Sequence, residues 1–177
     1  MTLFDATHDL HHACEQHLLG QAMVNGAVTP QHWADWLWAM RALHSVVDAA
    51  LPVHMARDAV LGADLSVLPK AHSSRAALRY AQDLIGQDCT GAAYVLHGAH
   101  HSGGRVLAPR LAKRGLPSLH TSYLDAAASK AWIVAARTRL EATQQARATF
   151  QCLLAVMDEI VAREGLGSPI TALESQP

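Results

Sequence analysis

Apolar residues recur with helical spacing along most of this 177-residue chain, and no stretch sustains the period-two alternation of a half-buried strand. Alanine and leucine, which favour helices, are abundant. Glycine and proline lie mainly between the periodic segments, where a helical chain needs breaks. The sequence therefore predicts an all-α fold.

These breaks divide the chain into a predicted bundle of about seven helices. The first helix is expected to end at Asn25-Gly26, because glycine readily adopts the left-handed conformation of a helix C-terminus. The second is expected to begin at Thr29-Pro30, with threonine as the cap and proline in the first turn. The expected ranges are 3–24, 30–51, 55–61, 75–85, 90–113, 122–140 and 143–163.

Length and charge restrict the class of protein. The chain has the size of one domain, expected over residues 1–164 and followed by a flexible tail at 165–177. Fourteen Lys and Arg residues oppose 15 Asp and Glu residues, so nothing indicates binding to nucleic acid through its phosphates. No apolar run approaches the roughly 20 residues that span a bilayer.

Neither the N-terminus nor the cysteines indicate export. The first residues lack the basic and apolar regions of a signal peptide. Cys14, Cys89 and Cys152 are odd in number and far apart, unlike a disulfide framework or a CxxC motif. We therefore expect a cytoplasmic protein with reduced thiols and no membrane association.

Histidine is abundant, with 12 residues in a chain that is only 5% aromatic. Six of the histidines form two clusters with the spacing i, i+3, i+4, which brings imidazoles to one helix face. The clusters are His8, His11 and His12, followed by Glu15, and His97, His100 and His101. Imidazole binds zinc, copper, nickel and iron, including haem iron. Solvated or capping histidines are the alternative interpretation.

The residues around the clusters narrow the choice of metal. A di-iron bundle needs glutamates from several helices, and Glu15 is the one acid suitably placed. Structural zinc usually needs cysteine beside histidine, and no cysteine has that spacing. Haem, or a zinc or nickel site made mostly of histidine, remains.

Three glycines interrupt the helical segment AYVLHGAHHSGGRVL, namely Gly98, Gly103 and Gly104. Each costs about 1 kcal/mol relative to alanine in a helix interior. Such a cost usually reflects a bend or a close approach to the backbone. A flat macrocycle against a kinked helix explains both, whereas a helix crossing on small residues or a simple loop remains the alternative.

Several segments, in the same order, resemble the haem oxygenase family. ATHDLHHACEQ resembles its proximal-helix signature, and NGAVTPQHWADWLWAMRALHSVVDAAL resembles its second helix. AYVLHGAHHSGGRVL resembles the glycine-kinked distal helix, and KAWIVAARTRLEATQQARATFQCLLAVMDEI resembles the closing helices. The resemblance covers most of the chain. It implies a single-domain, haem oxygenase-like helical bundle over residues 1–164, with haem between the proximal N-terminal helix and the distal helix.

The resemblance also implies roles for individual residues. His11 would be the proximal ligand of the haem iron, and Glu15 would accept its other ring N–H or order water as a catalytic residue. Gly103 and Gly104 would let the distal helix lie on the haem. The other residues implied to contact haem are Tyr94, Ala99, Lys130 and Arg137, of which Tyr94 and Lys130 would bind the propionates.

Two positions depart from the family pattern. His100 occupies the place of a distal aspartate that orders the water for proton delivery in many members. His100 would either take over that catalytic role or coordinate the iron and give a bis-His haem, with His97 or His101 as substitutes. Phe4 and His8 replace lysines that reach the propionates, which implies weaker or rearranged anchoring.

The resemblance implies an enzyme that binds haem b as both substrate and cofactor. It would cleave haem with dioxygen and electrons to biliverdin, carbon monoxide and ferrous iron. The chain has no flavin or nicotinamide motif, so a ferredoxin, a flavodoxin-like protein or a reductase is expected as the electron donor.

Other classes of protein remain open. The first is a haem carrier or sensor without turnover, built on the same fold and holding a bis-His haem. The second is a thiamine-salvage hydrolase or a quinone-cofactor oxidase with a related helical fold; for the hydrolase Cys89 is the candidate nucleophile, although no set of acidic partners is evident. The third is a histidine-rich zinc or nickel binder.

The remaining conspicuous side chains are assigned structural roles. Trp33 and Trp36, three residues apart, are expected to pack into the bundle. The histidines outside the two clusters are expected at the surface or at helix caps; they include His32, His44, His54, His72 and His120.

Overall fold

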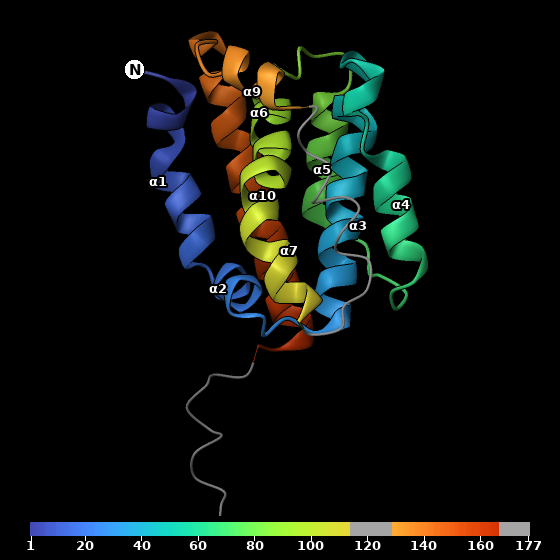
Figure 1. Ribbon diagram of the computed structural model, residues 1–177. Coiled ribbons are helices and arrows are strands. Elements are labelled where there is room, and N and C mark those ends of the chain that lie inside the picture. Colours follow the sequence, from blue (N-terminus) through green and yellow to red (C-terminus); the bar gives the residue numbers. More distant parts are fainter. Residues whose placement is uncertain (114–128, 167–177) are drawn as a thin grey trace, which may run out of the picture.

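The computed structural model describes residues 1–113 and 129–166, and every regular element in these ranges is helical (Figure 1). The α-helices are α1 (Leu3–Gln16), α2 (Leu18–Asn25), α3 (Pro30–Val47), α4 (Asp58–Ser66), α5 (Arg75–Leu84), α6 (Thr90–Gly98), α7 (Gly104–Ala112), α9 (Lys130–Ala136) and α10 (Thr143–Glu164). A π-helical turn, η3 (Ala99–Gly103), joins α6 to α7. Short 3₁₀ turns are η1 (Asp48–Ala50), η2 (Val53–Met55) and η5 (Leu140–Ala142).

The predicted all-α class is confirmed, but two of the expected helices are divided. The segment expected at 3–24 forms α1 and α2, which meet at His17 in an extended conformation. Nδ1 of His17 accepts a hydrogen bond from the backbone N of Leu19 at 3.1 Å and so caps α2. A Cβ on Gly20 would lie 2.2 Å from the carbonyl oxygen of Cys14, so only glycine permits this close turn.

Local capping explains the start of α3. The Thr29 hydroxyl accepts a hydrogen bond from the backbone N of His32 at 3.1 Å. Nδ1 of His32 accepts one in return from the backbone N of Thr29 at 3.2 Å. This reciprocal pair is a capping box with histidine in the place usually held by Glu or Gln. The expected cap at Thr29, the capping role of His32 and the stop at Gly26, which has a φ of 69°, are confirmed.

The core surrounds α10, which packs against α1, α3, α5 and α6. Figure 1 shows α10 behind α6 and α7, between the α1–α2 pair and the group formed by α3, α4 and α5. Trp33 is 0% exposed and Trp36 is 4% exposed, so their expected packing in the bundle is confirmed. Buried leucines such as Leu37, Leu96 and Leu153 fill the remaining space, each stabilising the fold by about 1.5–3 kcal/mol.

The glycine-rich segment is the second divided helix. α6 continues through η3 into α7, so the expected interruption takes the form of a π-helical turn. Gly91 lies at a tight helix crossing, where a Cβ would be 2.5 Å from the carbonyl oxygen of Ala142. A Cβ on Gly98 or Gly103 meets no atom within 4 Å, so a tight crossing does not explain these two glycines.

Two further predictions fall partly outside the described residues. Only α9 and η5 represent the helix expected at 122–140, and most of the tail expected at 165–177 is likewise outside.

The short helix expected at 55–61 is displaced, because α4 begins at Asp58 and extends to Ser66. Among the described helices, none combines the length and the apolar character that crossing a membrane requires.

Candidate functional site

A cavity of about 400 Å³ lies between the α1–α2 pair and the continuous segment α6–η3–α7. Side chains of α9 and α10 also contribute to its lining. The lining is mostly apolar and includes Phe4, Met23, Trp36, Val106, Phe150 and Leu153. Its volume and character are those of a site for a small organic ligand.

His11 of α1 contributes an imidazole to this cavity. Its side chain is 45% exposed, and its Nδ1 lies 3.7 Å from a carboxylate oxygen of Glu15, one turn later. Glu15 also lines the cavity. The ring of Phe150 packs edge-on against His11, with centroids 5.8 Å apart, and restricts the orientation of the imidazole. Since Nδ1 faces Glu15, Nε2 is the nitrogen left for a ligand.

The opposite wall is formed by small residues of the segment α6–η3–α7. Gly98, Ala99, Ser102 and Gly103 line the cavity. Because a Cβ on Gly98 or Gly103 would enter open space, any larger side chain there would occupy the cavity itself. Gly104 begins α7, is buried, and is not among the lining residues.

Cationic side chains gather near one part of the cavity. Arg137, which directly follows α9, lines the cavity, whereas Lys130, the first residue of α9, is exposed to solvent and is not a lining residue. Partial burial lowers the pKa of His101, and the positive charges of Arg105, Lys130 and Arg137 lower it further. These three cations therefore lie in one region, where they could pair with anionic groups of a ligand.

Tyr94 of α6 lines the cavity and is 7% exposed. Burial raises the pKa of its hydroxyl, and neighbouring Arg137 opposes this rise. Tyr94 is thus both a core residue and a cavity residue next to a cation.

His100 does not face the cavity. Its side chain is buried, and its Nε2 lies 2.8 Å from Nε2 of His44 on α3. His100 is therefore not in a position to contact a ligand in the cavity directly, and its catalytic role stays a prediction. The segment α6–η3–α7 is rotated so that Ala99 and Ser102 face the cavity. His97 and His100 point to the other side, toward the end of α3.

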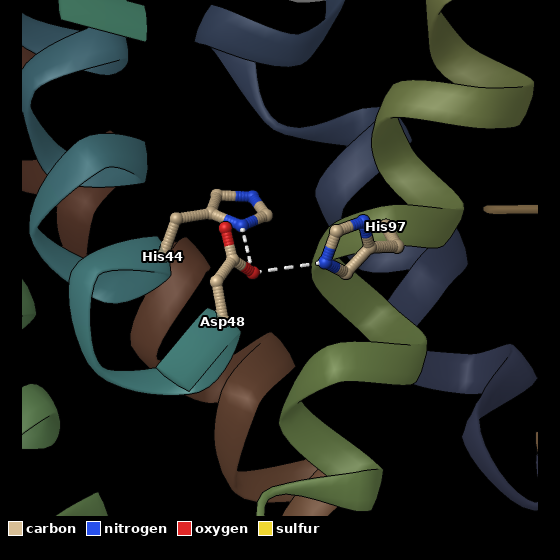
Figure 2. Close-up of side chains that lie close together, drawn as sticks. All are labelled: His44, Asp48 and His97. Carbon is tan, nitrogen blue, oxygen red and sulfur yellow. Dashed lines mark hydrogen bonds and ion pairs between the residues drawn. The ribbon is translucent and has the colours of Figure 1, made fainter. Parts of the chain in front are cut away.

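A buried polar cluster behind this wall was missed by sequence reasoning (Figure 2). One carboxylate oxygen of Asp48 lies 3.0 Å from Nδ1 of His44 and 3.0 Å from Nε2 of His97, and accepts from both. The other accepts a hydrogen bond from the backbone N of Arg57 at 2.7 Å. His44 was expected at the surface or at a cap, yet it is 0% exposed. The i, i+4 spacing of His44 and Asp48 on one helix was the available signal.

Electrostatics favour a neutral His44, a neutral His100 and an ionised Asp48. Burial lowers the pKa of His44 and, more strongly, that of His100. Burial raises the pKa of Asp48, but hydrogen bonds from His44 and His97 outweigh that effect and hold it below its ordinary value.

The three cysteines are free thiols and are buried. Burial raises the pKa of Cys14, which lines the cavity, to about 12. Cys89 lies outside the cavity lining, and burial raises its pKa as well. Since the thiolate is the nucleophile, neither cysteine has the environment of a catalytic nucleophile.

Comparison with known proteins shows which solved structure this fold resembles. No family model matches the chain, and neither does any curated protein. Among solved structures, the chain is similar to haem oxygenase-1 from the cyanobacterium Synechocystis sp. PCC6803, solved in complex with haem. The TM-score is 0.67 at 15% sequence identity, over 92% of this chain and 90% of that one. The chain therefore has a haem oxygenase-like fold.

Proposed function

We propose that this protein binds haem in the cavity between α1 and the segment α6–η3–α7 and degrades it as a haem oxygenase. The observation that carries the proposal is the pair of facing walls. One presents the imidazole of His11, and the other presents Gly98, Ala99 and Gly103. This arrangement occurs in a fold shared with a haem oxygenase that was solved with haem.

The shape and polarity of the cavity fit a flat, largely apolar macrocycle. Most of the lining is apolar, and the two glycines leave open space where side chains would otherwise project. A ring system that lies close to the helix backbone would account for glycine at positions 98 and 103, where each glycine costs about 1 kcal/mol relative to alanine.

His11 would hold the iron through Nε2 as a neutral imidazole. The carboxylate of Glu15, 3.7 Å from Nδ1, favours the tautomer with the proton on Nδ1. That tautomer leaves the lone pair of Nε2 available for iron. Phe150 packs against the ring and would help to keep it in position.

Arg137, Lys130 and Arg105 would bind the two propionate groups. These cations share one region beside the cavity, and Arg137 is adjacent to the hydroxyl of Tyr94. Arg137 can form bidentate hydrogen bonds to a carboxylate, whereas Lys130 provides a point charge. This arrangement would compensate for the family lysines replaced by Phe4 and His8.

The wall opposite His11 favours oxygenase over a bis-His carrier. In the described part of the lining, that wall carries no imidazole, because His97 and His100 turn toward α3. An open position opposite His11 is what binding of dioxygen requires. When bound, haem supplies both the iron that activates dioxygen and the ring that is cleaved. Electrons would come from a ferredoxin, a flavodoxin-like protein or a reductase.

The deciding experiment is an absorbance titration of the purified protein with hemin, followed by reductant in air. We expect a Soret band that saturates at one hemin per chain and then decays as the bands of biliverdin appear. His11→Ala should weaken hemin binding at least tenfold and abolish the decay. His12→Ala, on the neighbouring exposed residue, is the matched control and should behave like the unmodified protein.

Other outcomes would overturn parts of the proposal. A low-spin spectrum that persists under reductant and air would replace the oxygenase with a carrier or sensor. Failure to bind hemin, in a protein with an intact helical circular dichroism spectrum, would mean that this fold serves another ligand.

A further inference from the structure

The cluster behind the cavity wall has the donor atoms of a metal site. His44 and Asp48 come from the end of α3 and from η1, and His97 comes from α6, so the group joins two helices distant in sequence (Figure 2). One nitrogen or oxygen from each of the three residues lies within 4.8 Å of the others. The side chains are 0%, 6% and 0% exposed, respectively. No other group of this kind in the described ranges is buried as a whole.

We propose that His44, Asp48 and His97 bind one divalent transition-metal ion of the zinc class. The ligands would be Nδ1 of His44, a carboxylate oxygen of Asp48 and Nε2 of His97. Two imidazoles and one carboxylate form the donor set of many zinc and non-haem iron sites. Three protein ligands leave a position for water. This site is separate from the proposed haem cavity and does not depend on the proposed function.

The two histidines have partners suited to metal ligands. Without metal, Nδ1–H of His44 and Nε2–H of His97 both donate to Asp48. Metal binding requires those two lone pairs, so each proton must move to the other nitrogen of its ring. Nε2 of His44 would then donate to Nε2 of His100, 2.8 Å away, and Nδ1 of His97 would donate to the hydroxyl of Ser129, 3.3 Å away. Such outer hydrogen bonds accompany most histidine ligands.

The three imidazoles of His44, His97 and His100 carry the same number of protons with and without the metal. The proton that His100 donates to His44 in the metal-free form moves to Nδ1 of His100. Each of the three imidazoles carries one proton before and after the exchange, so no proton has to be released.

The carboxylate is also held in place before a metal arrives. The backbone N of Arg57 donates to one oxygen of Asp48 at 2.7 Å, which leaves the other directed at the two imidazoles. Ligands that are already converged lose little conformational entropy on binding. Because the three side chains are buried, uptake requires a local opening of the fold and should be slow.

The test uses the full-length protein, treated with chelator and then incubated with Zn²⁺ or Co²⁺ during refolding from urea. We expect one tightly bound ion per chain after desalting, and visible d–d absorption with Co²⁺. The variants His97→Gln and Asp48→Asn should lower the affinity at least tenfold. Ser129→Ala keeps all three ligands and removes one outer partner, so it should lower the affinity about tenfold.

The matched control is His72→Gln. His72 belongs to a more exposed group with Asp35 and Glu164, in which Arg163 already pairs with Asp35 at 2.7 Å. This variant should bind metal like the unmodified protein. Far-ultraviolet circular dichroism and cooperative urea unfolding report whether each variant folds. If a variant of a ligand residue fails to fold, Ser129→Ala still tests the metal site, because it keeps all three ligands.

Three results would overturn the proposal. The first is no retained metal in the refolded protein, which would leave the cluster as a hydrogen-bonded network only. The second is unchanged affinity in folded His97→Gln and Ser129→Ala. The third is loss of binding in His72→Gln, which would locate the metal at the surface.

Discussion

Neighbouring residues of the segment α6–η3–α7 face two different environments. Gly98, Ala99 and Gly103 face an open cavity, whereas His97 and His100 are buried against α3. The turn where this happens is π-helical, and π-helical turns often accompany functional sites. The chemistry of this segment therefore depends on which side each residue faces as much as on its type.

Substitution of two glycines should separate ligand binding from stability. Gly103→Ala places a Cβ in open space, so the free energy of unfolding should stay the same or rise by up to about 1 kcal/mol. Hemin affinity should fall, since the new methyl group occupies the cavity wall. Gly91→Ala should instead destabilise the protein by about 1–3 kcal/mol, because its Cβ would lie 2.5 Å from the oxygen of Ala142. Urea unfolding and hemin titration of both variants check this contrast.

Buried histidines should make the protein sensitive to mild acid. The pKa values of His44 and His100 are lowered by burial, so in this pH range the unfolded chain binds more protons than the folded one. The free energy of unfolding should therefore fall as pH decreases below about 6.5, by at most about 1.4 kcal/mol per pH unit for each group. It should level off above that pH.

Urea titrations between pH 5 and 8 would measure this slope. His100→Gln should make it shallower, whereas the same change at exposed His54 should leave it unchanged. His32 has a pKa lowered by burial as well and contributes to the slope in every variant. A slope that is equal in the unmodified protein and in His100→Gln would contradict the assignment.

At the scale of elements, the junction of α1 and α2 positions one wall of the cavity. His17 ends the first helix and caps the second, and Gly20 permits the second to turn close to the carbonyl group of Cys14. His11 and Glu15 lie on α1, and Met23 and Val24 lie on α2, all along the same cavity. The angle between the two helices therefore affects the shape of the proposed haem site.

A methyl group at this junction should disturb both stability and binding. Gly20→Ala forces a Cβ to within 2.2 Å of a backbone oxygen, which cannot move as a flexible side chain would. We expect a loss of about 1–3 kcal/mol in the free energy of unfolding and weaker hemin binding. Ala13→Gly, on the same helix as His11, is the control and tests whether any change in α1 has this effect. Gly165→Ala would not serve, because Gly165 has a φ of 65°, which alanine rarely adopts.

For the whole molecule, the cavity and the histidine cluster lie on opposite sides of one helical wall. Each proposed ligand would bind the folded chain and not the unfolded chain, so each should stabilise the protein by about 2.7 kcal/mol at a free concentration of 100 times its Kd. Because no residue is shared between the two sets of ligands, we expect the two effects to be additive.

Thermal unfolding with hemin, with Zn²⁺ and with both would test this independence. His11→Ala should remove only the shift caused by hemin, and His97→Gln should remove only the shift caused by Zn²⁺. A loss of both shifts in either variant, with its helical content unchanged, would show that the two sites are coupled.

The helical class and many helix ends could be predicted because local interactions determine them. Thr29 caps α3 and Gly26 ends α2 through contacts within a few residues, and the π-helical turn η3 lies in the glycine-rich segment between Gly98 and Gly104. The break at His17 has no glycine or proline at the break itself, and it depends on the close approach of Gly20, three residues later, to the carbonyl group of Cys14. A continuous first helix was therefore predicted and is wrong.

The sequence by itself determined that this chain is helical, where most of its helices end, and that a glycine-rich segment must lie against open space or a ligand. Tertiary structure decided which side chains meet. His11 and Gly103 line one cavity, whereas His100 and His44, 56 positions apart, lie in contact beyond its wall. The direction in which a helical residue points depends on the rotation of its helix against its neighbours, and that rotation is settled only when the whole core packs.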